Sequence, residues 1–160
     1  MKHLIAAATL LASPALAELT QANLTQTNLT QADPDQLSAL ISSQGYPVEQ
    51  GTDDIGDPQL VVKSEGTAFY IQFYGCGEDH LNCTSVQFLA AFDMADGMTA
   101  EQALGWSRDQ RFTSVYLDDE QDPFLQMDMN IDGGVSEANF TDNLEIWRSS
   151  LSAFKDYIDW

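Results

Sequence analysis

Residues 68–92, AFYIQFYGCGEDHLNCTSVQFLAAF, contain the two most strand-like runs of the chain, one on each side of a short polar loop. Runs rich in aromatic and aliphatic residues that are bounded by Gly, Asp and Asn are typical of a β-hairpin. The chain has two cysteines, and they stand at the two ends of this loop, Cys76 before it and Cys83 after it. In an oxidising compartment this arrangement predicts one disulfide that closes the hairpin.

The N-terminus predicts such a compartment. Lys2 precedes an apolar run at residues 4–11, and small residues follow as far as Ala17. This is the layout of a cleaved secretory signal, so we expect residues 1–17 to be removed and the mature protein to be periplasmic or secreted. No cysteine follows the small residues, and no later apolar stretch nears the roughly 20 residues that span a bilayer, so no membrane anchor is expected.

The chain is strongly acidic, with 25 Asp and Glu residues against six Lys and Arg residues and a formal net charge of −19. Signal cleavage removes Lys2, which leaves about 143 residues with a charge of about −20, enough chain for one domain with a sizeable core. Nucleic acids and anionic lipid surfaces are bound by dense Lys/Arg patches, so neither is an expected partner. The charge also favours solubility.

A five-residue pattern occurs three times near the start of the mature chain, at residues 19–23, 24–28 and 29–33. Three units are too few to stack as a solenoid and bury a core. Residues 18–32 are therefore expected to form a polar linker whose removal changes stability little, and the folded domain is expected over residues 33–160.

Local signals divide this domain into helices and strands. Asp33 caps a first helix that Gly45 ends, Thr99 with Gln102 forms the capping box of a second, and Ser136 caps a third. Strands are expected at residues 46–48, 60–64, 68–74, 85–92, 112–117 and 124–131. The order of helix, strands, helix, hairpin and helix predicts an α+β fold, in which an antiparallel sheet packs against helices.

The third helix has one apolar stripe, in which the residues are alternately four and three apart. The stripe comprises Phe140, Leu144, Trp147, Leu151, Phe154 and Ile158. A stripe with this period faces a core, so we expect this helix to pack on the sheet.

An ordered set of aromatic, Gly, Cys and Asp positions runs through most of the chain. The set comprises Gly56, Asp57, Pro58, Phe73, Tyr74, Gly75, Cys76, Cys83, Gln87, Phe88, Trp106, Arg111, Phe112, Tyr116, Leu117, Asp118, Asp122, Asp128, Gly133, Gly134, Val135 and Trp147. In this order the residues resemble the YbjN domain family, and the resemblance covers Asp33 to Phe154. It implies a fold similar to that of type III secretion chaperones, which are small α/β proteins that bind partners and often pair.

Members of the family are described as bacterial sensory-transduction regulators, so the resemblance implies a binding or regulatory role more than a reaction. Many members resemble cytoplasmic proteins. This chain departs from them in its signal sequence.

Histidine is scarce, which limits the routes to catalysis. After signal cleavage His80 is the one that remains, and its place in the cysteine loop favours an exposed polar side chain over membership of a catalytic triad. A zinc site of Cys76, Asp79, His80 and Cys83 is disfavoured, because zinc-binding cysteines usually have two to four residues between them and these have six.

Glycoside hydrolysis requires two carboxylates across a cleft. Four residues are candidates for that role: Asp57, Asp118, Asp122 and Asp128. Each falls in a turn or at an exposed strand position, where Asp is favoured for local hydrogen bonding. Trp106, Tyr116 and Trp147 are candidates to line a sugar cleft, but aromatic residues at strand or helix spacing usually belong to the core.

Asp128, Asn130, Asp132 and Gly133 match the opening of an EF-hand calcium loop. The twelfth position, which should be Glu, is Asn139, and the segment before the match is strand-like instead of helical. The in/out alternation of a strand also accounts for the spacing of the acidic residues.

The sequence favours a non-enzymatic periplasmic binding or regulatory module that has no catalytic residue, metal or cofactor. It contains no phosphate-binding glycine loop and no basic patch. A protein partner would meet an exposed apolar patch on the first helix or the sheet, and pairing of two copies through that patch is left open. A carboxylate-dependent hydrolase and a calcium-binding domain are the alternatives.

Overall fold

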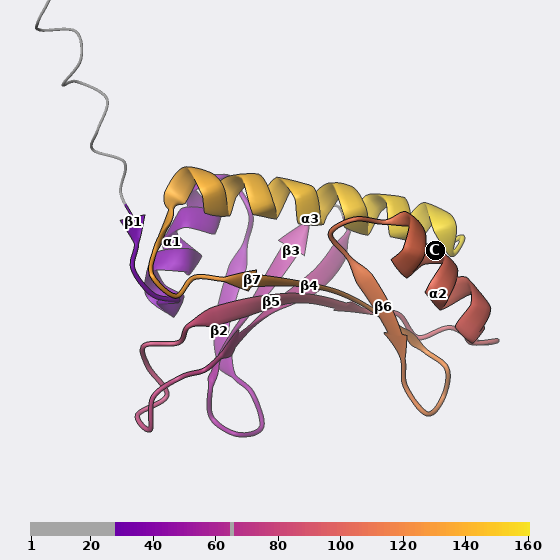
Figure 1. Cartoon of the computed structure of the whole chain (residues 1–160), viewed down its shortest axis with the longest axis horizontal. Helices are drawn as coiled ribbons and strands as arrows, with labels where there is room; N and C mark the ends of the chain where they lie inside the picture. The colour runs from indigo at the N-terminus through magenta and orange to yellow at the C-terminus, as the bar shows by residue number, and fades with distance from the viewer. Residues whose placement is uncertain (1–27, 65) are drawn as a thin grey trace, which may run out of the picture.

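The structure is a computed structural model, and it describes residues 28–64 and 66–160. Within these residues a six-stranded sheet has the spatial order β2 (Val48–Thr52), β3 (Pro58–Ser64), β4 (Thr67–Tyr74), β5 (Ser85–Ala91), β7 (Pro123–Asn130) and β6 (Ser114–Leu117). All neighbouring strands of this sheet are antiparallel (Figure 1). The predicted signal peptide lies outside the described residues, as does most of the predicted linker.

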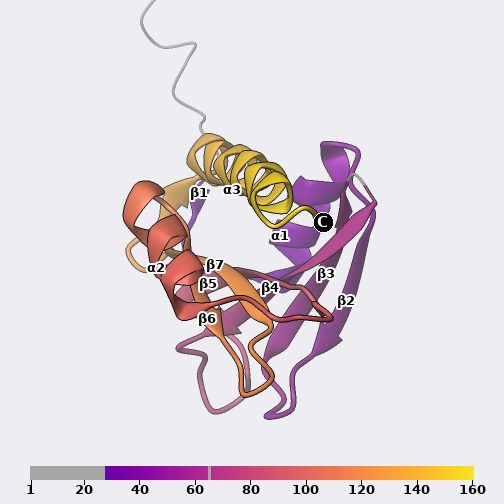
Figure 2. The ribbon, with the colours of Figure 1, turned by 90° about the vertical axis from the view of Figure 1, so that its right-hand side faces the viewer.

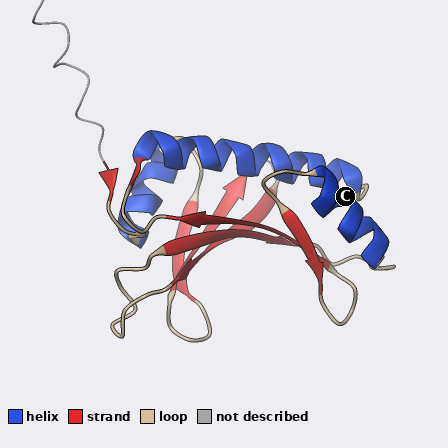
Figure 3. Ribbon diagram, viewed as in Figure 1, coloured by secondary structure: helices blue, strands red, loops and turns tan. Residues whose placement is uncertain are grey.

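Three helices accompany the sheet in the described part of the chain: α1 (Pro34–Ser43), α2 (Ala100–Asp109) and α3 (Glu137–Tyr157). The long helix α3 runs across one face of the sheet with α1 beside it, and α2 packs near the edge formed by β6 (Figures 2 and 3). The opposite face of the sheet carries no helix among the described residues (Figure 1). The predicted α+β architecture is confirmed.

The predicted helix caps are present. The Asp33 carboxylate accepts a hydrogen bond from the backbone N–H of Gln36, with Pro34 at the first helical position. Thr99 and Gln102 form the reciprocal capping box of α2. Ser136 accepts from the N–H of Asn139 at the start of α3. Each side chain satisfies a backbone N–H that has no partner within its helix.

The core lies between α3 and the sheet. The predicted apolar stripe is buried from Phe140 to Phe154, while Ile158, the C-cap of α3, is partly buried. Trp147 lies at the centre of the stripe, with its ring centroid 5.7 Å from those of Phe69 on β4 and Phe88 on β5. Phe140 extends this cluster toward the start of the helix, and Phe154 extends it toward Trp106 of α2, 4.9 Å away. The helical spacing therefore identified the residues that hold α3 on the sheet.

The end of the predicted linker belongs to the fold. β1 (Asn28–Leu29) pairs with β8 (Val135–Ser136), just before α3. Leu29 and Ala32 are fully buried, and the N–H of Ala32 donates to the carbonyl of Cys83 over 2.8 Å. Residues 28–32, which were expected to belong to the linker, thus pack on the domain directly before the predicted boundary at residue 33.

Two strand predictions need correction at their starts. The strand predicted at residues 46–48 is β2 at Val48–Thr52, because Pro47 has no N–H for a ladder while pairing with β3 continues through Gly51. The strand predicted from residue 112 begins at Ser114, since the Thr113 hydroxyl instead accepts a hydrogen bond from Trp106 Nε1 over 3.1 Å.

Candidate functional site

One face of the six-stranded sheet is covered by no helix of residues 28–64 and 66–160, and we call it the open face. Strand alternation puts the following residues on it: Gln59, Val61, Lys63, Tyr70, Gln72, Tyr74, Ser85, Gln87, Leu89, Ser114, Tyr116, Phe124, Gln126, Asp128 and Asn130. Their neighbours along β4 and β7, such as Phe69 and Met127, point to the opposite side and are buried under α3.

Side-chain amides form a connected row across the middle strands of the open face. Gln87 donates to Gln126 Oε1 over 3.3 Å and to the carboxylate of Asp128 over 3.0 Å. On the neighbouring strand, the Tyr74 hydroxyl donates to Gln72 Oε1 over 2.7 Å. These bonds hold polar side chains in place on a surface that faces solvent, so the face presents fixed donors and acceptors.

Aromatic rings lie among the amides. Tyr70, Tyr74 and Tyr116 are 37%, 43% and 42% exposed, so each leaves a large part of its ring at the surface. Tyr116 stacks on Phe124 with centroids 4.9 Å apart and an interplanar angle of 12°. The sequence left Tyr116 and Trp106 open between a cleft and the core. The structure exposes Tyr116, because strand alternation directs it to the open face, and it buries Trp106. Trp147 is buried, as its place in the α3 stripe predicted.

The electrostatic environment of the open face is negative. Partial burial raises the pKa of Tyr74 above its usual range, and the nearby carboxylates of Asp128 and Asp53 raise it further. Partial burial likewise raises the pKa of Tyr116, with added effects of Tyr74 and Asp118. Both tyrosines are therefore held in their neutral, hydrogen-donating form.

The hairpin loops extend this negative field. The β2–β3, β4–β5 and β6–β7 loops project on the side of the sheet away from α3 (Figures 1 and 2). They carry nine acidic residues and no Lys or Arg: Asp53, Asp54, Asp57, Glu78, Asp79, Asp118, Asp119, Glu120 and Asp122. The open face itself has one cation, Lys63, whose ammonium lies 2.6 Å from Glu49 on β2.

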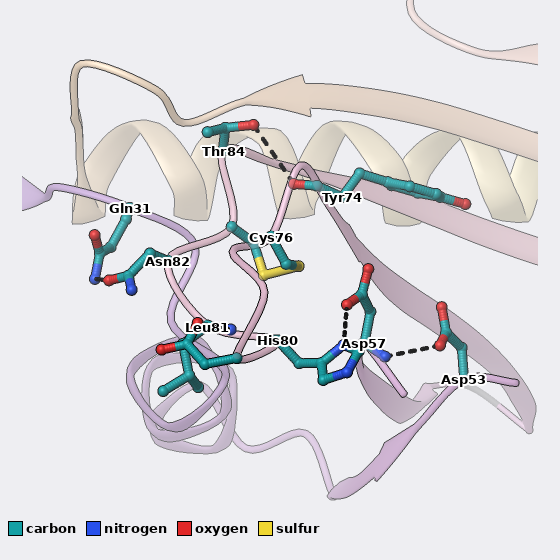
Figure 4. Close-up of a disulfide and its surroundings, with 11 residues drawn as sticks. Gln31, Asp53, Asp57, Tyr74, Cys76, His80, Leu81, Asn82 and Thr84 are labelled. Carbon is teal, nitrogen blue, oxygen red and sulfur yellow. Dashed lines mark hydrogen bonds and ion pairs between the residues drawn. A yellow bond between two sulfur atoms is a disulfide. The ribbon is translucent and has the colours of Figure 1, made fainter. Parts of the chain in front are cut away.

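The cysteine loop lies at one end of the open face. Cys76 and Cys83 are joined with their Cα atoms 3.8 Å apart, at the base of the β4–β5 loop. The loop is tied to its surroundings at a second point, because Gln31 donates to Asn82 over 2.6 Å (Figure 4). The disulfide leaves no thiolate there for the zinc set that was disfavoured above.

His80 links two loops, which the sequence did not reveal. Its Nδ1 lies 2.7 Å from Asp57 Oδ1 in the β2–β3 loop, and its ring points toward that carboxylate (Figure 4). The ring also packs against Gly56, where an added Cβ would come within 3.2 Å of it. Asp53 fixes the β2–β3 loop by accepting from the N–H groups of Ile55 and Asp57. His80 is thus half-exposed, as predicted, but it is also a structural contact.

The four candidate catalytic carboxylates do not converge on one site, although Asp118 and Asp122 lie close to each other. Asp57 and Asp128 are placed toward one end of the sheet, whereas Asp118 and Asp122 flank the β6–β7 turn at the other end of β7. Asp122 and Asp128 are six positions apart, which is roughly 20 Å along a strand. That distance is too long for an acid and a base that act on one glycosidic bond. In the closer pair, Asp118 and Asp122 accept hydrogen bonds from backbone N–H groups of the turn and of Met94, so the geometry favours a structural role for them.

The structure also gives no support to the calcium-loop alternative. Asp128 and Asn130 lie within strand β7, and Asp128 faces the open side with Gln87 as its partner. The carboxylates that the described residues do bring together are Asp118, Glu120 and Asp122, with one oxygen of each within 4.8 Å of the others. Asp118 accepts from two backbone N–H groups of the turn and Asp122 accepts from Met94, so local hydrogen bonds account for this arrangement.

The open face was missed at the sequence level, although a signal for it exists. Along β4 the residues Tyr70, Gln72 and Tyr74 alternate with Phe69, Ile71 and Phe73. The tyrosine hydroxyls and the amide mark the side that reaches solvent, because a buried hydroxyl requires a partner while Phe and Ile do not. Of the two places expected for a contact patch, α1 has no large exposed apolar side chain, whereas the sheet exposes the rings of Tyr70, Tyr74 and Tyr116.

No helix in the described residues is long and apolar enough to span a bilayer.

Comparison with known proteins gives a match to a model of the YbjN family over residues 33–160, and that family is described as "Putative bacterial sensory transduction regulator". No curated protein and no solved structure matches the chain, so the likeness to type III secretion chaperones stays a prediction. The family match covers most of the chain and agrees with the resemblance found in the sequence: this protein belongs to the YbjN family.

Proposed function

We propose that this protein is a non-enzymatic binding module of an extracytoplasmic regulatory system, and that it binds a protein partner through the open face of its sheet. The open face carries the proposal. It presents three half-exposed tyrosine rings within a hydrogen-bonded row of amides, on the side of the domain that no helix covers. Tyrosine is enriched at protein interfaces because its ring supplies contact area and its hydroxyl supplies a hydrogen bond.

The family description supports a regulatory role. The carboxylates favour binding over hydrolysis, since the candidates are divided between two ends of the sheet and Asp118, Asp122 and Asp128 accept hydrogen bonds from neighbouring groups of the fold. The module is proposed to act without metal or cofactor.

An extracytoplasmic location is supported by the signal-like residues 1–17 and by the cysteine pair. The proposed organisation is a cleaved signal at residues 1–17, a polar linker after it, and the YbjN domain. The packing of Leu29 and Ala32 suggests that the linker ends near residue 27.

Site-specific crosslinking in cells tests the proposed surface. A photoreactive amino acid is introduced at Tyr70 on the open face and, as the matched control, at Leu104, an apolar side chain of α2 that is 71% exposed. We expect covalent adducts with another protein from position 70 and none from position 104. Adducts from position 104 alone, or from neither position, would contradict binding through the open face.

Thiol labelling tests the proposed compartment. Protein recovered from the cell envelope without reductant is denatured and treated with an alkylating reagent. We expect no labelling of Cys76 or Cys83 until a reductant is added, because both thiols would be held in the disulfide. Two reactive thiols before reduction, together with an uncleaved N-terminus, would contradict export.

A further inference from the structure

We propose that the open face binds a lysine- or arginine-rich segment of its protein partner. This inference rests on the proposed function and adds the chemistry of the partner. It follows from the combination of exposed aromatic rings, side-chain acceptors and the scarcity of cations on this face.

The charge around the open face is almost entirely negative. Nine carboxylates lie in the three loops at its ends, and Asp128 lies on the face itself. The one cation on the face, Lys63, is already neutralised by Glu49. The other four cations of the described residues lie on the helical side, on or next to α2 and α3: Arg108, Arg111, Arg148 and Lys155. The open face thus presents carboxylates and a single, already paired cation to an approaching cationic segment, whereas the carboxylates of the helical side are interspersed with four cations.

The side chains of the open face can also bind cations directly. Ammonium and guanidinium groups bind over aromatic rings, and they donate hydrogen bonds to amide and carboxylate oxygens without accepting any. The protein already uses such pairs on its helical side, where Arg148 lies 4.5 Å from the ring centroid of Tyr46 and Arg111 lies 5.1 Å from that of Phe112. Tyr70, Tyr74 and Tyr116 expose aromatic rings of the same kind, and no cation of the described residues is paired with any of these three rings.

The chain itself offers no comparable occupant. Residues 1–27 contain Lys2 as their sole Lys or Arg, and Lys2 belongs to the expected signal. A second copy would bring the same excess of acid, and three of its five remaining cations pair with its own carboxylates: Lys63 with Glu49, Arg108 with Asp109 and Arg148 with Glu145. A cationic segment of a different protein complements the face better than either.

Peptide binding tests the inference. The probe is a fluorescent 12-residue peptide of alternating Lys and Ser, compared with the same peptide carrying Glu for Lys, and anisotropy is measured in low salt. The test variant replaces Asp53 and Asp128, the two carboxylates near Tyr74, by Asn, which keeps an acceptor oxygen for the turn bonds of Asp53. The matched control makes the same change at Asp142 and Asp156, two exposed residues of α3.

We expect the Lys peptide to bind and the Glu peptide to give no signal. In the Asp53→Asn/Asp128→Asn variant the Kd should rise about fivefold, because two partly exposed charge interactions are lost, and in the α3 control it should change less than twofold. Equal weakening in the two double variants would show diffuse attraction to an acidic protein and would overturn the inference. Binding of the Glu peptide at equal affinity would also overturn it.

The two proposals fail in different ways. Adducts from position 70 in cells, combined with no Lys-peptide binding, would leave the binding face in place and refute the cationic partner. Lys-peptide binding that weakens only in the α3 control would place the cationic site on the helices and refute the further inference, whereas the crosslinking result alone decides the proposed function.

Discussion

The two faces of the sheet are built from the same strands but have different chemistry. On β4 the side under α3 carries Phe69, Ile71 and Phe73, all fully buried, whereas the open side carries Tyr70, Gln72 and Tyr74. On β7 three buried apolar residues alternate in the same way with Gln126 and Asp128. We infer that the covered face supplies the packing that stabilises the domain, whereas the open face contributes little to stability. The experiments below test this division, starting with the largest expected effect.

Removing Trp147 should cause the largest loss of stability. Its ring is fully buried between Phe69 and Phe88, so Trp147→Ala should lower the free energy of unfolding by about 4 kcal/mol. The control is Trp147→Phe, which keeps a ring; the buried indole Nε1 has no hydrogen-bond partner in the described part of the chain, so little polar interaction is lost. Chemical denaturation measures both variants. A loss under about 1 kcal/mol for the Ala variant would mean that Trp147 is not a core residue.

The second largest loss of stability is expected from a change in the segment before α1. Leu29 is fully buried and pairs with Val135, so Leu29→Ala should lower the free energy of unfolding by about 3 kcal/mol. Deletion of residues 18–27 is the matched comparison and should change it by less than about 0.5 kcal/mol, because the polar repeat is too short to bury a core. If the deletion proves as costly as the Leu29 change, the repeat is part of the fold and the linker prediction is wrong.

The open face should affect stability mainly at alkaline pH. Folding raises the pKa of Tyr74 and Tyr116, so the folded state holds these two protons more tightly than the unfolded chain does. Their contribution to stability is therefore fully present below the ordinary tyrosine pKa of 10.0 and is lost as the pH rises above it. Absorbance titration of tyrosinate in the folded protein should show a late step that Tyr74→Phe diminishes. Complete ionisation of Tyr74 below pH 10 would contradict the negative environment of the open face.

Much of the fold could be predicted from the sequence, because its signals are local. The caps at Asp33, Thr99 and Ser136 and the apolar stripe around Trp147 depend on residues within a few turns of one helix. The hairpin of β3 and β4 was equally clear, since its two strands are separated by a short glycine turn. Such elements can be predicted from periodicity without knowledge of any tertiary contact.

The remaining features depend on contacts between distant segments. Leu29 pairs with Val135, and His80 meets Asp57 from another loop, so neither contact has a local signature. The exposure of Tyr116 could not be deduced because alternation separates the two faces of a strand without telling which of them a helix will cover. The candidate site is such a face, and it became visible once the helices were placed.

The most direct test of the division between the faces measures stability and binding in one variant. Tyr70→Gln/Tyr74→Gln removes two exposed rings from β4 and keeps polar side chains there. We predict that the free energy of unfolding falls by less than about 2 kcal/mol, well below the loss for Trp147→Ala, while the Kd for the Lys–Ser peptide rises about tenfold. Unchanged peptide affinity, or a loss of stability as large as that of Trp147→Ala, would contradict the account.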